Sequence, residues 1–206
     1  MIFSERNYIS RNIENKQEGK IFEGLLFGSV PKTSVGEYEK PEFAFERIKR
    51  IQEHSENPHC PFMRKFLEVI VVEMKRFKGE SDEVAKKYFP DPRMRMYTAV
   101  GSSLDTHQGI DAFVEWICPN GEVRRVTLDA TLKSIKDTYK ADILFSFPEE
   151  LKRNFTEETF RENLDKGIYD RVVYEVASEV VRRLKRLPGE KKGTFYCEAK
   201  REGEKH

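Results

Sequence analysis

The stretch that decides the fold runs from residue 109 to residue 133 and reads GIDAFVEWICPNGEVRRVTLDATLK. Two runs in which apolar and polar residues alternate flank the sequence Pro119-Asn120-Gly121. Pro and Asn suit the two central positions of a type I turn, and Gly suits the left-handed residue that follows them. The sequence therefore predicts a β-hairpin with a three-residue loop, in which Cys118 lies opposite Glu122.

This register decides which side chains share a face, because side chains alternate along a strand. One face is predicted to be polar and the other to be core. The polar face holds Asp111, Phe113, Glu115, Arg125, Thr127, Asp129, Thr131 and Lys133. The core face holds Ile110, Ala112, Val114, Trp116, Val126, Leu128, Ala130 and Leu132, with Arg124 as its only charge.

Two carboxylates, Asp111 and Asp129, lie directly opposite each other in this register. Their Cβ atoms would be about 4.5 to 5.5 Å apart, a distance at which like charges destabilise a sheet. A bound cation would offset this repulsion, and a raised pKa on one of the two acids is the other way to relieve it. A two-residue Asn120-Gly121 turn is the alternative, and it would put the two acids on opposite faces of the sheet.

The rest of the sequence places helices before and after the hairpin. Apolar spacing and turn residues predict helices over residues 14–27, 41–54 and 62–78, and one long helix that begins near Thr156. Strands are predicted over 94–100, 109–117, 122–133 and 139–147, with a short one over 194–200. We expect one domain over 1–206. It comprises a mostly helical part (1–90), a β-rich core (91–150), a long helix (155–188) and a C-terminal tail (189–206).

The predicted fold class is α/β (α+β), with a central mixed or mainly antiparallel sheet flanked by helices. Net charge is +1, so the total charge does not indicate a strongly basic nucleic-acid binder, although a local patch stays open. The cysteines Cys60, Cys118 and Cys197 form no CxxC pair, which favours neither a disulfide framework nor a cysteine zinc site. Neither a spanning segment nor a signal peptide is indicated, so we expect a cytoplasmic protein without a membrane partner.

At residues 109–114 and 126–133 the chain resembles the PD-(D/E)xK nuclease superfamily. The resemblance implies a restriction-endonuclease-like core, and a Mg²⁺ ion (or Mn²⁺) bound by Asp111 as the first acid and Asp129 as the second. It also implies a catalytic lysine, for which Lys133 is the candidate. Ile110 stands in place of the name-giving proline and Thr131 in place of the lysine, so Lys133 is displaced by two residues along the same face.

The function that this resemblance implies is a magnesium-dependent nuclease that hydrolyses phosphodiester bonds. The implied partner is nucleic acid, with DNA favoured over RNA, and a homodimer stays open. The alternative is a catalytically degenerate domain of the same fold that binds nucleic acid or acts as a scaffold, which Thr131 favours.

A third acid would complete the metal site, and the sequence offers Glu73. This residue falls within the apolar arc of the predicted helix over 62–78, where a carboxylate needs a partner. Pairing with a lysine or arginine is the structural alternative, and Glu18 is the rival ligand. Asp105 and His107, in the segment that leads into the hairpin, could orient water or phosphate.

Overall fold

The fold is built on one mixed five-stranded sheet whose strands follow chain order. The computed structural model describes residues 19–31, 38–76, 79, 89–131, 140–147, 156–186 and 195–198. The strands are β1 (Met94–Thr98), β2 (Ala112–Ile117), β3 (Val123–Thr131), β4 (Ile143–Ser146) and β5 (Phe195–Glu198). β1, β2 and β3 pair antiparallel, whereas β3, β4 and β5 pair parallel. The predicted α/β class with a mixed sheet is therefore confirmed.

The β2–β3 hairpin has the predicted loop and register. The Cys118 N–H donates to the Glu122 carbonyl at 2.8 Å, and the Gly121 N–H donates to the Cys118 carbonyl at 2.9 Å. Gly121 adopts a φ of 83°, the left-handed conformation that the turn requires. Ala112 pairs with Leu128, as the three-residue loop predicts and as a two-residue turn would not allow.

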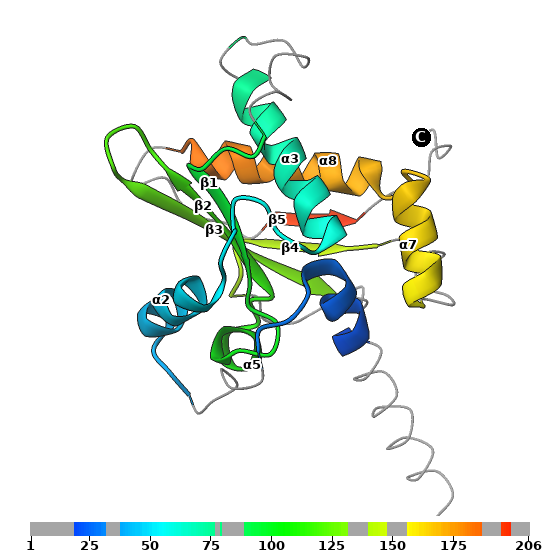
Figure 1. Ribbon diagram of the computed structural model, residues 1–206, viewed down its shortest axis with the longest axis horizontal. Coiled ribbons are helices and arrows are strands. Elements are labelled where there is room, and N and C mark those ends of the chain that lie inside the picture. The colour runs from blue at the N-terminus through cyan, green and yellow to red at the C-terminus, as the bar shows by residue number, and fades with distance from the viewer. Residues whose placement is uncertain are drawn as a thin grey trace, which may run out of the picture.

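Helices cover both faces of the sheet (Figure 1). On one face lie α3 (Pro61–Arg76) and α8 (Asp170–Leu184), and on the other lie α2 (Pro41–Ile51) and α5 (Ser103–Gln108). A helix over residues 19–27 and α7 (Glu157–Asp165) pack their apolar side chains into the core on the α3 side. Among the helices of the described residues, none is both long and apolar enough to cross a membrane.

The face that was predicted to be polar is in fact buried beneath α2 and α5. Phe113 stacks on Tyr97 with ring centroids 4.8 Å apart and meets Phe45 of α2 edge to face at the same distance. These rings belong to a second apolar cluster that also contains Ile110, which was predicted to lie on the opposite face. Ile110 precedes β2, so the alternation of the strand does not extend to it.

The predicted cross-strand pair Glu115–Arg125 anchors α2 to this buried face. Arg125 Nη2 lies 2.5 Å from Glu115 Oε1, and Lys49 Nζ lies 3.4 Å from Glu115 Oε2. The Arg125 guanidinium also lies 3.8 Å from the centre of the Phe45 ring. A carboxylate that is only 2% exposed is thus compensated by two cations.

The long helix predicted over 155–188 is two helices, α7 and α8, separated by a turn. Thr156 caps α7 as predicted, because its Oγ1 accepts the Thr159 N–H at 3.2 Å. Gly167 ends this first helix in a left-handed conformation with a φ of 72°. Its N–H donates to the Leu164 carbonyl at 3.1 Å, and the Ile168 N–H donates to the Asn163 carbonyl at 3.0 Å.

Two glycine substitutions test the hairpin conformation. A Cβ atom at either Gly121 or Gly24 would meet nothing within 4 Å, so neither alanine would clash with a neighbouring residue. The two substitutions therefore differ only in the backbone conformation at the substituted position. Gly121→Ala should lower the free energy of unfolding by about 1 to 2 kcal/mol, the cost of the left-handed conformation for an L-residue. Gly24→Ala, in the helix over 19–27, should raise it by about 0.5 to 1 kcal/mol. Urea denaturation measures both, and a stabilising Gly121→Ala would contradict this loop.

Candidate metal centre

Asp111 is fixed at the open end of the hairpin by the backbone of both neighbouring strands. Its N–H donates to the Leu128 carbonyl at 2.9 Å, and its carbonyl accepts the Ala99 N–H at 2.7 Å. Its carboxylate accepts the Ala130 N–H at 2.7 Å. The residue is 2% exposed, and Asp129, the next residue on β3 after Leu128, is 3% exposed. The two predicted acids therefore lie in the same buried region.

A short helix, α5, brings a third acid to this region. The Ser102 side chain caps the helix by accepting the Leu104 N–H at 3.1 Å, and Gly109 ends it with a φ of 59°. Asp105 lies in its first turn and accepts the Gly101 N–H at 2.7 Å through Oδ2. The sequence predicted a loop here, because six residues are too few to show a helical period.

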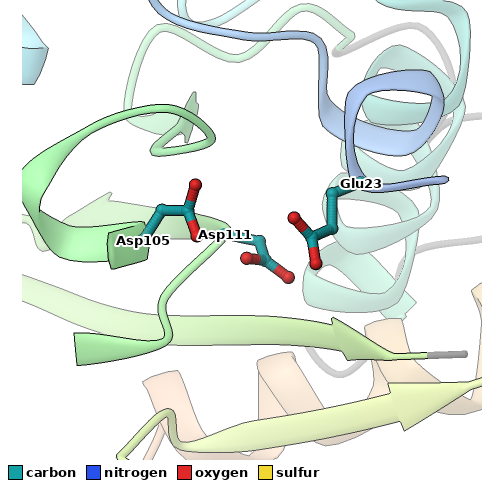
Figure 2. A group of neighbouring side chains, drawn as sticks. All are labelled: Glu23, Asp105 and Asp111. Carbon is teal, nitrogen blue, oxygen red and sulfur yellow. The ribbon is translucent and has the colours of Figure 1, made fainter. Parts of the chain in front are cut away.

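Three carboxylates converge in front of the hairpin end. Glu23, Asp105 and Asp111 each offer an oxygen, and these oxygens all lie within 4.8 Å of one another. Figure 2 shows the three side chains directed toward a common space, from three separate segments of the chain. Hard carboxylate oxygens in such a group are the ligands that Mg²⁺, Mn²⁺ and Ca²⁺ prefer.

The electrostatics of this group favour a cation. The pKa of Asp111 is raised well above its usual value, first by burial and then by the negative charges of Glu23 and Asp129. The hydrogen bond from Ala130 opposes this shift, and Asp105 adds to it. A divalent ion would favour the ionised form of Asp111 and offset the repulsion between the acids.

Glu23 is the group member that the sequence analysis missed. It lies in the helix over 19–27, next to Phe22 and one turn before Phe27, both of which are buried. The sequence signal that could have indicated Glu23 was a carboxylate at the border of a stripe of apolar residues. It pointed to Glu23 as much as to Glu18, the rival that was named and that lies outside the described residues.

Glu73, the predicted third ligand, is not brought into this group. α3 carries it against α8, where Oε1 accepts a hydrogen bond from Arg76 at 2.6 Å and Oε2 accepts one from Ser178 at 3.4 Å. Pairing with a nearby arginine was the structural alternative for this residue. Glu73 thus has partners of its own on the outer side of the α3–α8 pair.

The other predicted site residues are Asp105, His107, Asp129 and Lys133. Asp105 joins the group of three, whereas His107 is exposed in the last turn of α5. Asp129 is not a member of that group among the described residues, but its charge acts on Asp111. Lys133 lies outside the described residues, two positions beyond Thr131, the last residue of β3.

The chain matches no protein-family model, no curated protein and no solved structure.

Removing the charge of Asp111 should stabilise the protein in metal-free buffer. A raised pKa means that ionising Asp111 costs more in the folded state than in the unfolded state, so stability falls as pH rises above the unfolded value. Asp111→Asn should then raise the free energy of unfolding on the order of 1 kcal/mol at neutral pH, or about 2 to 4 °C in Tm for a chain of this size.

The advantage of Asp111→Asn should vanish as pH falls below about 3.9, where an unfolded aspartate is protonated as well. Thermal melts in EDTA across this range make the comparison. A variant that is less stable than the parent at pH 7 would show that Asp111 is stabilised by compensating charge.

Metal should raise the stability of the parent protein, because an ion that binds only the folded state adds about 2.7 kcal/mol at 100 times its Kd. Melts with Mn²⁺ and with EDTA measure the shift. Glu23→Gln and Asp105→Asn should each reduce it. Glu73→Gln is the matched control and should keep the metal-induced shift, since Glu73 is paired with Arg76. A shift lost in Glu73→Gln and kept in Glu23→Gln would reverse the assignment.

Proposed function

We propose that this protein is a metal-dependent nuclease that hydrolyses phosphodiester bonds of nucleic acid. The observation that carries the proposal is the convergence of Glu23, Asp105 and Asp111 at the hairpin end, beside Asp129. The resemblance of the hairpin sequence to the PD-(D/E)xK superfamily supports the same chemistry. The proposed cofactor is Mg²⁺ or Mn²⁺, and the proposed substrate is DNA in preference to RNA.

The donor set fits a hard divalent ion. All of its donor atoms are carboxylate oxygens, and one member, Asp111, is held by hydrogen bonds to the backbone of β3 and of Ala99, which follows β1. Rigid placement of this kind is what a metal site needs from its protein. A bound ion would supply Lewis acidity toward the phosphate and would lower the pKa of a coordinated water.

Lys133 is the proposed group that stabilises negative charge on the phosphate or positions the attacking water. It follows Asp129 by four positions in the sequence, the spacing that led us to expect both side chains on one face. Lys140 is the alternative cation, because its Nζ donates to the His107 carbonyl at 2.9 Å on the helix that carries Asp105. Lys200 is a further candidate outside the described residues.

A second function has one observation in its favour. Thr131 occupies the position of the family's lysine, and it is buried, at 5% exposure. A domain that keeps the acids but lacks a lysine at this position could bind nucleic acid or act as a scaffold without cutting it.

Two substitutions separate metal binding from chemistry. Asp129→Asn should weaken metal binding and abolish cleavage, because the negative charge of Asp129 acts on Asp111 of the acidic group, whereas Lys133→Ala should bind metal and lose cleavage by about 10² to 10³ in rate. Cleavage of single-stranded DNA, duplex DNA and RNA is followed with Mg²⁺, with Mn²⁺ and with EDTA. Glu158→Gln, on the exposed surface of α7, is the control for a lost or altered charge.

Three outcomes decide between the proposals. Metal-dependent cleavage that Asp129→Asn abolishes supports the nuclease. Metal binding without cleavage of any substrate by the parent protein rejects it in favour of the scaffold. Cleavage by Lys133→Ala at the rate of the parent excludes Lys133 as the catalytic cation and leaves Lys140 and Lys200 to be replaced.

A further inference from the structure

The exposed aromatic ring of Tyr38 packs against α5, the helix that carries Asp105. Tyr38 is 64% exposed, and its ring meets the His107 ring edge to face with centroids 5.5 Å apart. His107 belongs to α5, two residues after Asp105. One short helix therefore contributes a carboxylate to the acidic group and, through His107, contacts an exposed aromatic ring.

The segment that carries Tyr38 is anchored on two sides. The Glu39 N–H donates to Ser103 Oγ of α5 at 3.2 Å, and the Glu39 carboxylate lies 2.9 Å from Arg47 Nη2 of α2. The ring is consequently placed by its neighbours, although most of its surface meets solvent. An ordered, exposed aromatic ring loses little conformational entropy when a ligand stacks on it.

Two exposed cations and a second exposed aromatic ring lie in segments that carry Tyr38 or contact α5. Lys140 reaches the same helix through its hydrogen bond to the His107 carbonyl, and both Lys140 and Lys40 are exposed. Phe43, in the first turn of α2, is also 64% exposed. Aromatic rings interleaved with cations form the surface that single-stranded nucleic acid binds, with bases on the rings and phosphates near the cations.

We propose that Tyr38, supported by His107 and flanked by Lys140, is a stacking platform for an unpaired nucleotide of the substrate. The inference deepens the nuclease proposal and rests on it for the identity of the ligand. A base in a duplex already stacks on both faces, so a single exposed ring selects nucleic acid that offers an unpaired base. The substrate class is therefore single-stranded or partly unwound nucleic acid.

The test measures binding in EDTA, so that it does not depend on cleavage. Fluorescence anisotropy compares a labelled single-stranded oligonucleotide with the duplex of the same sequence. The parent protein should bind the single strand more tightly. Tyr38→Ala should weaken that binding by about 5-fold to 100-fold, the range for loss of one stacked base. Tyr38→Phe should keep it, because the ring is retained.

A matched control is available on the opposite face of the molecule's sheet. Tyr174 of α8 is 46% exposed and has the Arg76 guanidinium 6.0 Å from its ring centre, so it also combines an aromatic ring with a cation. Tyr174→Ala should bind the single strand as the parent does. If Tyr38→Ala fails to fold, Tyr38→Leu replaces it, because leucine keeps apolar bulk without a ring.

The outcomes separate this inference from the nuclease proposal. Binding of single strands that depends on the Tyr38 ring supports the platform even if no cleavage is seen, in which case only the nuclease proposal fails. Tyr38→Ala and Tyr38→Leu that bind like the parent overturn the platform while a metal-dependent activity stands. A parent protein that prefers the duplex, or that binds neither form, also overturns it.

Discussion

Burial of the Asp111 carboxylate at the open end of the β2–β3 hairpin is the constraint on which the site depends. A buried carboxylate is costly unless its oxygens are satisfied, and here the Ala130 N–H supplies a donor at 2.7 Å. The backbone of Asp111 is also hydrogen-bonded on both sides, because its carbonyl accepts the Ala99 N–H and its N–H donates to the Leu128 carbonyl. Because Ala99 directly follows β1 and Leu128 lies within β3, the alignment of β2 with both of its neighbours places this one side chain.

The other acids reach Asp111 only through tertiary packing. Glu23 belongs to a helix that is held in the core by Phe22, Leu26 and Phe27, with the Phe22 ring 5.4 Å from that of Phe147 at the end of β4. Asp105 depends on a six-residue helix that is too short to be stable alone. The position of each carboxylate oxygen is therefore linked to the packing of the core, and Glu23 is far from Asp105 and Asp111 in sequence.

The difference between features set by local sequence and features set by tertiary packing explains how much of the structure the sequence could predict. The hairpin register follows from Pro119-Asn120-Gly121, since turn chemistry is local, and it brings Asp111 and Asp129 to the same end of the sheet. The covered second face does not follow from local patterns, because the burial of Phe113 beneath α2 and α5 is decided by distant segments. Glu23 and Glu73 were equally plausible as acids at the border of an apolar stripe, and only the packing of their helices distinguishes them. The break at Gly167 was a local signal that the apolar periodicity of the flanking residues obscured.

The treatment of other buried acids shows why the group at Asp111 differs from a structural network. The negative charge of the buried Glu115 in β2 is compensated by Arg125 and Lys49. Glu179 in α8 is bound by Arg182 and Arg183, and although burial opposes it, these hydrogen bonds hold the pKa of Glu179 below its usual value. The pKa shift at Asp111 has the opposite sign, because burial raises its pKa and the acidic charges of Glu23 and Asp129 raise it further. Among the described residues, the buried carboxylates of Glu115 and Glu179 are paired with cations of the chain, whereas the acidic charges around Asp111 raise its pKa, which suits that group to a bound cation.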